Sequence, residues 1–159
     1  RLLEVYDVFG MIPPPTERDG PDVHRRYADI VAGRAGGIAG DEYYGYQTGL
    51  LDQVVHTFKQ YGYSAESANV RFIAGLFEET LMPRGAVALA HIDCDWYDAV
   101  SLCLHRIWPA LVPGGVIVVD DYDAWSGCRR AVDEFVSQIA DAVVQRGSRL
   151  RLRKSLVTS

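Results

Sequence analysis

Aspartates stand at the carboxyl ends of two short apolar segments, and this feature most constrains the fold. Residues 86–93 read AVALAHID and end in Asp93, and residues 116–121 read VIVVDD and end in Asp120 and Asp121. Short, continuously apolar segments of this length are typical of buried parallel strands. In open α/β sheets, the carboxyl ends of the strands line the crevice that binds ligands. The sequence therefore predicts acidic side chains at the ligand-binding edge of a sheet.

Strand-like and helical segments alternate along the 159 residues. Strands are predicted at residues 2–9, 69–75, 86–93, 116–121 and 149–157. Helices are predicted at residues 24–31, 47–61, 77–82, 96–111 and 127–145. This alternation favours a single α/β domain over residues 1–159, with a mostly parallel sheet and helices on both of its faces.

A segment rich in proline and glycine, residues 13–45, interrupts this pattern after the first predicted strand. It begins with three consecutive prolines and carries five glycines from Gly33 to Gly45. Proline lacks an amide donor and fixes φ, which excludes a central strand or an uninterrupted helix at its start. Long segments of this kind inside compact domains are usually functional. We interpret residues 13–45 as a lid that is mobile without a bound substrate.

Composition excludes several classes of partner. The net charge of −5 argues against sequence-independent binding of nucleic acid. No apolar stretch reaches the roughly 18 residues of a membrane span, and no signal peptide is visible. The three cysteines lack the spacing of metal ligands. We expect a cytoplasmic protein with reduced thiols that binds neither nucleic acid nor membranes. The sequence does not decide between a monomer and a homo-oligomer.

The acids at the two strand ends predict a metal site. Consecutive strands are commonly neighbours about 4.8 Å apart, which would bring Asp93 close to Asp120 and Asp121. Three carboxylates would repel one another unless a cation lay between them. An all-oxygen cluster suits Mg²⁺. The alternative is that one aspartate caps a helix and another is a solvated turn residue, but three acids at adjoining strand ends favour the metal site.

Other residues near the predicted strand ends carry weaker signals. Asp95 is either a helix cap or a catalytic base. Asp7 ends the first predicted strand, where an acid commonly accepts hydrogen bonds from a ribose. His91 should share a strand face with Asp93, and we expect a core histidine there. The basic run at 149–157 predicts a solvated strand face. Four aromatic residues after the acidic strand ends either line a pocket or pack in the core: Trp96, Tyr97, Tyr122 and Trp125.

Longer motifs carry a family resemblance. They read YDVFGMIPPP, VRFIAGLFEETL, HIDCDWYDAV and PGGVIVVDDYDAWSGCRRAVDEF, and the resemblance that they carry covers residues 2–136. Together they resemble the macrocin O-methyltransferase-like family of class I S-adenosylmethionine-dependent enzymes. The resemblance implies a Rossmann-like fold and methylation of sugar hydroxyls on glycosylated natural products. The family's first strand and glycine-rich cofactor loop have no counterpart here, which implies an N-terminally incomplete fold.

The resemblance also implies roles for individual residues. It implies that Mg²⁺ is bound by the three acids singled out above: Asp93, Asp120 and Asp121. It implies that S-adenosylmethionine is held by Asp7 at its ribose and by the turn at Gly75 and Phe77 near its adenine. Cys94 and His91 replace a glycine and an arginine that are common in the family. Both lie beside the acceptor pocket that the family has, so the identity of the acceptor stays open.

The reaction that this implies is methyl transfer to a small-molecule sugar or glycoside hydroxyl. Mg²⁺ would lower the pKa of the hydroxyl, and Asp93 or Asp95 would accept its proton. A catechol-type small-molecule O-methyltransferase and a non-catalytic binding module derived from the fold are the alternatives. A phosphoacceptor signalling domain is disfavoured, because only 38 residues follow Asp121 and such domains need a later phosphoacceptor strand and a lysine.

Overall fold

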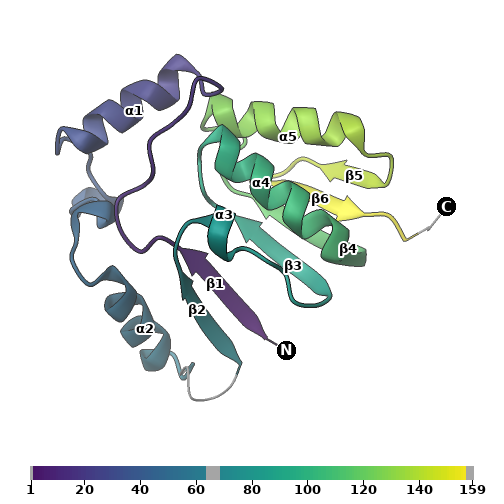
Figure 1. The fold of residues 1–159 in the computed structure, drawn as a ribbon, viewed down its shortest axis with the longest axis horizontal. Helices are drawn as coiled ribbons and strands as arrows, with labels where there is room; N and C mark the ends of the chain where they lie inside the picture. The colour runs from purple at the N-terminus through teal and green to yellow at the C-terminus, as the bar shows by residue number, and fades with distance from the viewer. Residues whose placement is uncertain (1, 64–68, 157–159) are drawn as a thin grey trace. The chain divides into compact units, whose positions relative to one another are not determined.

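The computed structural model describes residues 2–63 and 69–156. They form two compact units (Figure 1). The first unit contains the residues up to Pro14 together with Ala28–Leu81, and the second contains Pro15–Tyr27 and the residues from Met82 onwards. Among the described residues, no helix is long and apolar enough to cross a membrane.

The first unit is built on a two-stranded parallel sheet. Its elements are β1 (Leu3–Asp7), the 3₁₀ turns η1 (Ile38–Gly40) and η2 (Tyr44–Tyr46), α2 (Leu50–Gln60), β2 (Val70–Ala74) and α3 (Phe77–Thr80). Phe58 of α2 packs edge-to-face on Phe72 of β2, with ring centroids 5.0 Å apart. This contact fixes the amphipathic helix on the sheet and supplies apolar burial to both elements.

The predicted lid, residues 13–45, contains ordered structure. The helix α1 (Pro21–Val31) begins earlier than the predicted helix at 24–31 and includes residues of both units. Ile30 of α1 forms a small buried cluster with Ala35 and Tyr43. The hydroxyl of Tyr46 donates to the carbonyl of Ile30 at 2.6 Å, which ties the end of α1 to η2.

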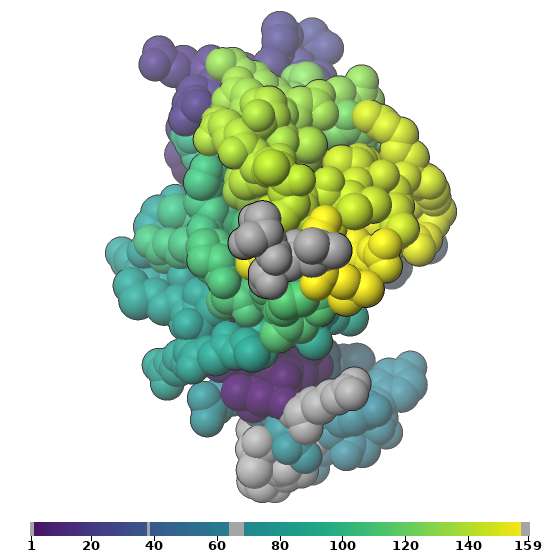
Figure 2. Space-filling model, turned by 90° about the vertical axis from the view of Figure 1, so that its right-hand side faces the viewer, coloured from purple at the N-terminus to yellow at the C-terminus, as the bar shows by residue number. Residues whose placement is uncertain are grey.

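The second unit carries a four-stranded sheet in the order β3-β4-β6-β5. Its elements are β3 (Val87–Ile92), α4 (Tyr97–Ile107), the 3₁₀ turn η4 (Trp108–Ala110), β4 (Leu111–Val119), α5 (Ser126–Gln138), β5 (Ala142–Gln145) and β6 (Leu150–Lys154). The helices α4 and α5 lie side by side along this sheet (Figure 1). Leu104, Ile117 and Leu152 contribute fully buried side chains from α4, β4 and β6. In the space-filling view, atoms of the C-terminal elements, coloured yellow-green to yellow, lie next to one another (Figure 2).

The prediction of a mostly parallel sheet is wrong, because the sheet of the second unit is mixed. β3 runs parallel to β4, but β6 runs antiparallel to both β4 and β5. The helix predicted over 127–145 ends at Gln138, and β5 takes the place of its last part. Only a short connection separates β5 from β6, and a short connection permits antiparallel pairing alone. The predicted strand at 149–157 is confirmed as β6, although residue 157 lies outside the described residues.

Candidate functional site

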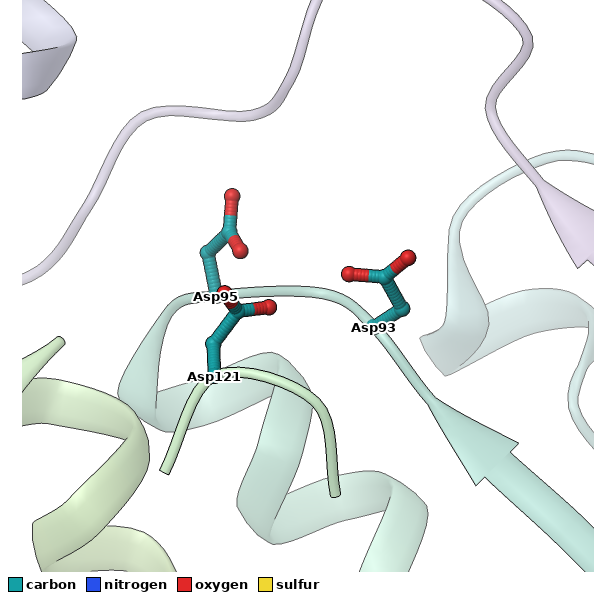
Figure 3. A group of neighbouring side chains, drawn as sticks. All are labelled: Asp93, Asp95 and Asp121. Carbon is teal, nitrogen blue, oxygen red and sulfur yellow. The ribbon is translucent and has the colours of Figure 1, made fainter. Parts of the chain in front are cut away.

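Three carboxylates converge where β3 and β4 end, and we call Asp93, Asp95 and Asp121 the acidic cluster. One carboxylate oxygen from each residue lies within 4.8 Å of the other two. Asp93 directly follows β3, Asp95 lies two residues later in the same loop, and Asp121 lies in the loop after β4 (Figure 3). The carboxylate of Asp93 points towards the other two side chains (Figure 3). The acidic cluster therefore contains residues from both acidic segments that the sequence analysis identified.

Parallel pairing of β3 and β4 brings the two loops together. Ile92 lies opposite Val119 in the ladder, and the amide of Asp120 donates to the carbonyl of Ile92 at 3.0 Å. The loop after β3 then turns sharply, because Asp95 has a φ of 59°. A non-glycine residue in this left-handed region is uncommon, and such strain is often found at functional sites.

The acidic cluster holds protons more tightly than isolated carboxyls do. Desolvation of its carboxyl group, a hydrogen bond with Asp121 and the charges of Asp121 and Asp120 raise the pKa of Asp93 to about 6. Burial and the neighbouring Asp95 raise the pKa of Asp121 to about 6. Burial also raises the pKa of Asp95. A proton or a cation between these groups would relieve their mutual repulsion.

Asp121 also has a polar atom without a partner. Its Oδ2 is buried and accepts no hydrogen bond from a donor among the described residues. A buried carboxylate oxygen in this state costs free energy, unless a neighbouring carboxyl supplies a proton or a cation binds there. This oxygen is therefore a site at which the acidic cluster can accept positive charge.

Asp120, the third acid of the predicted metal site, is directed towards basic side chains. Its Oδ1 accepts from Nε of Arg149 at 2.5 Å and lies 3.2 Å from Nε2 of His91. The hydrogen bond from Arg149, followed by that from His91, lowers the pKa of Asp120. The prediction that His91 is a core histidine is wrong, since its side chain is exposed. The structure thus brings Asp93 and Asp121 together, adds Asp95, and pairs Asp120 with Arg149.

Arg149 is a site residue that the sequence did not reveal. It lies just before β6, whose Leu150 pairs with Val119 in an antiparallel ladder. The start of β6 therefore lies at the carboxyl end of β4, next to Asp120. In the parallel arrangement that the sequence favoured, this residue would lie at the opposite end of the sheet. Its position at the edge of a strand rich in arginine is the signal that the sequence offers, and that run by itself predicts a solvated strand face.

The three residues predicted to bind the cofactor lie together in the first unit. β1 and β2 end side by side, with Asp7 opposite Ala74, and the amide of Gly75 donates to the carbonyl of Asp7 at 3.0 Å. Gly75 has a φ of 138°, which side chains rarely adopt. Phe77 begins α3 two residues later. The tight turn at Gly75 therefore brings the start of α3 close to the end of β1.

Comparison with known proteins identifies the family of this chain. The family model of macrocin O-methyltransferase (TylF) matches residues 41–144. The chain belongs to the macrocin O-methyltransferase family. This confirms the resemblance that the motifs indicated.

Relatives of known activity match part of the chain. A Streptomyces olivaceus 8-demethyl-8-(2,3-dimethoxy-alpha-L-rhamnosyl)-tetracenomycin-C 4'-O-methyltransferase is 38% identical over 87 residues, covering 54% of this chain and 32% of the relative. The mycinamicin III 3''-O-methyltransferase of Micromonospora griseorubida is 34% identical over 99 residues, covering 60% of this chain and 38% of the relative. The chain thus spans about a third of the length of these relatives.

Solved structures of O-methyltransferases share the fold. The O-methyltransferase NovP matches with a TM-score of 0.69 and 25% identity, over 98% of this chain and 60% of NovP. The calicheamicin methyltransferase CalS11 matches with a TM-score of 0.66 over 96% of this chain and 60% of that protein. At 19% identity, the match to CalS11 is evidence for the fold alone.

Proposed function

We propose that this protein is an S-adenosylmethionine- and Mg²⁺-dependent O-methyltransferase that acts on a hydroxyl of a sugar or glycosylated natural product. The observation that carries the proposal is the acidic cluster at the ends of β3 and β4, in a chain of the macrocin O-methyltransferase family. One relative is named as an O-methyltransferase of a rhamnosyl-tetracenomycin, which supports a sugar or glycoside as the acceptor class. Residues 1–159 would act as one methyltransferase domain, with residues 13–45 as a lid that excludes water.

The acidic cluster fits a hard divalent cation. The facing atoms of its three residues are all carboxylate oxygens, these atoms lie within 4.8 Å of one another, and Asp121 Oδ2 has no donor among the described residues. Mg²⁺ takes one or a few protein carboxylates and keeps several waters, so a small, partly open cluster suits it. When bound, Mg²⁺ would supply a Lewis acid that lowers the pKa of the acceptor hydroxyl.

The four aspartates would divide the work. Asp93 and Asp121 would hold the cation, with Asp120 as the third ligand after its carboxylate turns from Arg149. Asp95 would accept the hydroxyl proton, because a carboxylate outside the coordination shell keeps its basicity. Burial raises the pKa of Asp95, which brings it closer to the working pH of a general base.

The cofactor would be bound at the strand ends of the first unit. Asp7 would accept hydrogen bonds from the ribose, and the turn at Gly75 and Phe77 would contact the adenine. Such contacts would fix the orientation of the cofactor, and orientation of the reacting groups contributes much of the rate of group transfer.

Product analysis tests the proposed reaction. The protein in its full natural length is incubated with methyl-labelled S-adenosylmethionine, Mg²⁺ and two panels of acceptors, glycosides and catechols. We expect labelled methyl ether on a sugar hydroxyl, loss of the reaction with a chelator, and recovery with Mg²⁺. Label on catechols alone would assign the acceptor to the catechol class, and an unchanged rate after chelation would contradict the role of the metal.

A pair of variants tests the division of roles. Asp120→Asn should weaken binding of Mn²⁺, a spectroscopic substitute for Mg²⁺, by at least about tenfold, because one charged ligand is lost. Asp95→Asn should leave Mn²⁺ binding within about threefold and abolish methyl transfer. The reverse pattern of binding would make Asp95 the third ligand and exclude it as the base.

A further inference from the structure

The loop before α1 and the first turn of α1, residues 16–22, cap two helices of the second unit, and we call this segment the double cap. Asp19 is only 7% exposed. Its Oδ1 accepts from the amide of Tyr97 at 2.8 Å, and its Oδ2 accepts from the amide of Thr16 at 3.0 Å. Tyr97 is the first residue of α4, and Trp96 before it provides no side-chain cap. Asp19 therefore caps α4 from a segment 78 residues away.

Asp22 does the same for α5. Its Oδ2 accepts from the amide of Ser126 at 2.9 Å, and its Oδ1 accepts from the hydroxyl of Ser126. Ser126 is the first residue of α5, and Trp125 before it again provides no side-chain cap. A negative side chain at a helix N-terminus also interacts favourably with the helix dipole. Two aspartates three residues apart thus hold the starts of both helices.

Two glycines make this close approach possible. A Cβ atom at Gly127 would lie 2.1 Å from Asp19 Oδ1, and a Cβ atom at Gly20 would lie 2.1 Å from Ser126 Oγ. Real Cβ atoms do not approach other atoms so closely, so a side chain at either position would displace a cap. Gly127 belongs to α5, yet it packs on the aspartate that caps α4, which links the two caps to each other.

Both capped helices begin just after the loops that carry the acidic cluster. Asp95 lies two residues before Tyr97, and Asp121 lies five residues before Ser126. Trp96 and Trp125, each next to a capped residue, pack edge-to-face with ring centroids 5.9 Å apart. Repulsion among the carboxylates tends to separate the two loops, and the double cap connects the helix starts on the far side of those loops.

We propose that Asp19 and Asp22 are positioning residues that hold the two acidic loops at the spacing required for cation binding. This inference rests on the proposed function in so far as the cation is the metal of the methyl transfer. Neither aspartate belongs to the acidic cluster, and both act through the helix starts of α4 and α5. Supporting residues around a metal site typically change its affinity by 10- to 100-fold when they are mutated.

The test measures Mn²⁺ binding by electron paramagnetic resonance in the full-length protein. Asp19→Ala and Asp22→Ala should each weaken binding by about tenfold or more, with folded structure verified by circular dichroism. Asp19→Asn should weaken binding less than Asp19→Ala does, because the amide oxygen can still accept from the amide of Tyr97 while the NH₂ group cannot accept from the amide of Thr16. Glu17→Ala is the matched control, since it removes an exposed acid from the same segment and should leave binding unchanged. A folded Asp19→Ala variant with parental affinity overturns the proposal.

Amide exchange gives a second measurement that needs neither a metal nor turnover. Asp19→Ala should accelerate exchange both in the loop before α4 and in residues 120–125, which precede α5. Acceleration confined to the loop before α4 would make Asp19 a local cap and overturn the positioning role. If the parent protein binds Mn²⁺ but transfers no methyl group, the proposed function fails while the double cap stands. If the parent protein binds no cation, the proposed metal site is wrong. The amide-exchange result for Asp19→Ala then shows whether Asp19 holds both loops or only the start of α4.

Discussion

Cation binding by the acidic cluster should depend steeply on pH between 5 and 7. The pKa values of Asp93 and Asp121 are both raised to about 6, and a carboxylate binds a cation only in its ionised form. With a pKa of 6, each carboxyl is roughly nine-tenths ionised at pH 7 and roughly one-tenth ionised at pH 5. The fraction of molecules with both groups ionised therefore falls about 100-fold, and the apparent dissociation constant should rise by the same factor, about 2.7 kcal/mol.

The assay is a Mn²⁺ titration followed by electron paramagnetic resonance at pH 5, 6 and 7 and constant ionic strength. The two acids interact, so the slope belongs to the pair, and it should approach two protons released per cation at pH 5. Asp93→Asn should reduce the change between pH 5 and 7 to about tenfold, since one titrating ligand remains. Asp123→Asn is the control, because Asp123 is an exposed acid of the same loop that pairs with Arg129. A change below about threefold in the parent would refute the reasoning.

Three further outcomes follow from the same geometry. Without a cation, thermal stability should fall as pH rises from about 4 to 6, because the folded state binds protons at Asp93 and Asp121 more tightly than the unfolded chain does. Added Mg²⁺ should cancel this loss of stability. The measurement is calorimetry at several pH values, and a stability that does not change with pH would contradict the prediction. Asp7→Ala should weaken S-adenosylmethionine binding by about 1.5–3 kcal/mol through loss of a charged hydrogen bond, and unchanged calorimetric affinity in the full-length protein would exclude its ribose role. Arg149→Met should strengthen Mn²⁺ binding by up to about fivefold, because the half-exposed guanidinium of Arg149 no longer competes with the cation for Asp120. Weaker binding would mean that Arg149 holds Asp120 in place for the cation.

The sequence predicted most elements of the fold because their periodicity is strong, but the residues of β5 were assigned to the end of a helix. Val143 continues the apolar spacing of α5, so the helix was expected to run on to residue 145. In the structure α5 ends at Gln138, and Val143 and Val144 pair with β6. β-Branched residues favour strands, but the deciding contact is with a strand later in the chain. Local periodicity carries no information about such a partner.

The candidate site was predictable to the extent that it depends on strand ends. Asp93 and Asp121 follow two apolar segments, and parallel pairing of those segments brings the two acids together. Asp95 joins them through a backbone turn with positive φ, which no spacing rule reveals. Arg149 reaches Asp120 because β6 runs antiparallel. The orientation of a C-terminal strand is a property of the whole sheet, and the alternating pattern alone favoured the wrong one.

The acidic cluster has features that lower the stability of the fold, and this cost is the strongest reason to regard the cluster as functional. Desolvation and neighbouring carboxylates raise the pKa of Asp93, Asp95 occupies a strained backbone conformation, and a buried oxygen of Asp121 lacks a donor among the described residues. Each feature costs stability, and local conflicts of this kind are expected where a site serves a ligand. The double cap lies directly behind the same two loops and opposes their separation. A cluster that served only to cap helices would need none of these costs, because Asp19 and Asp22 already cap α4 and α5.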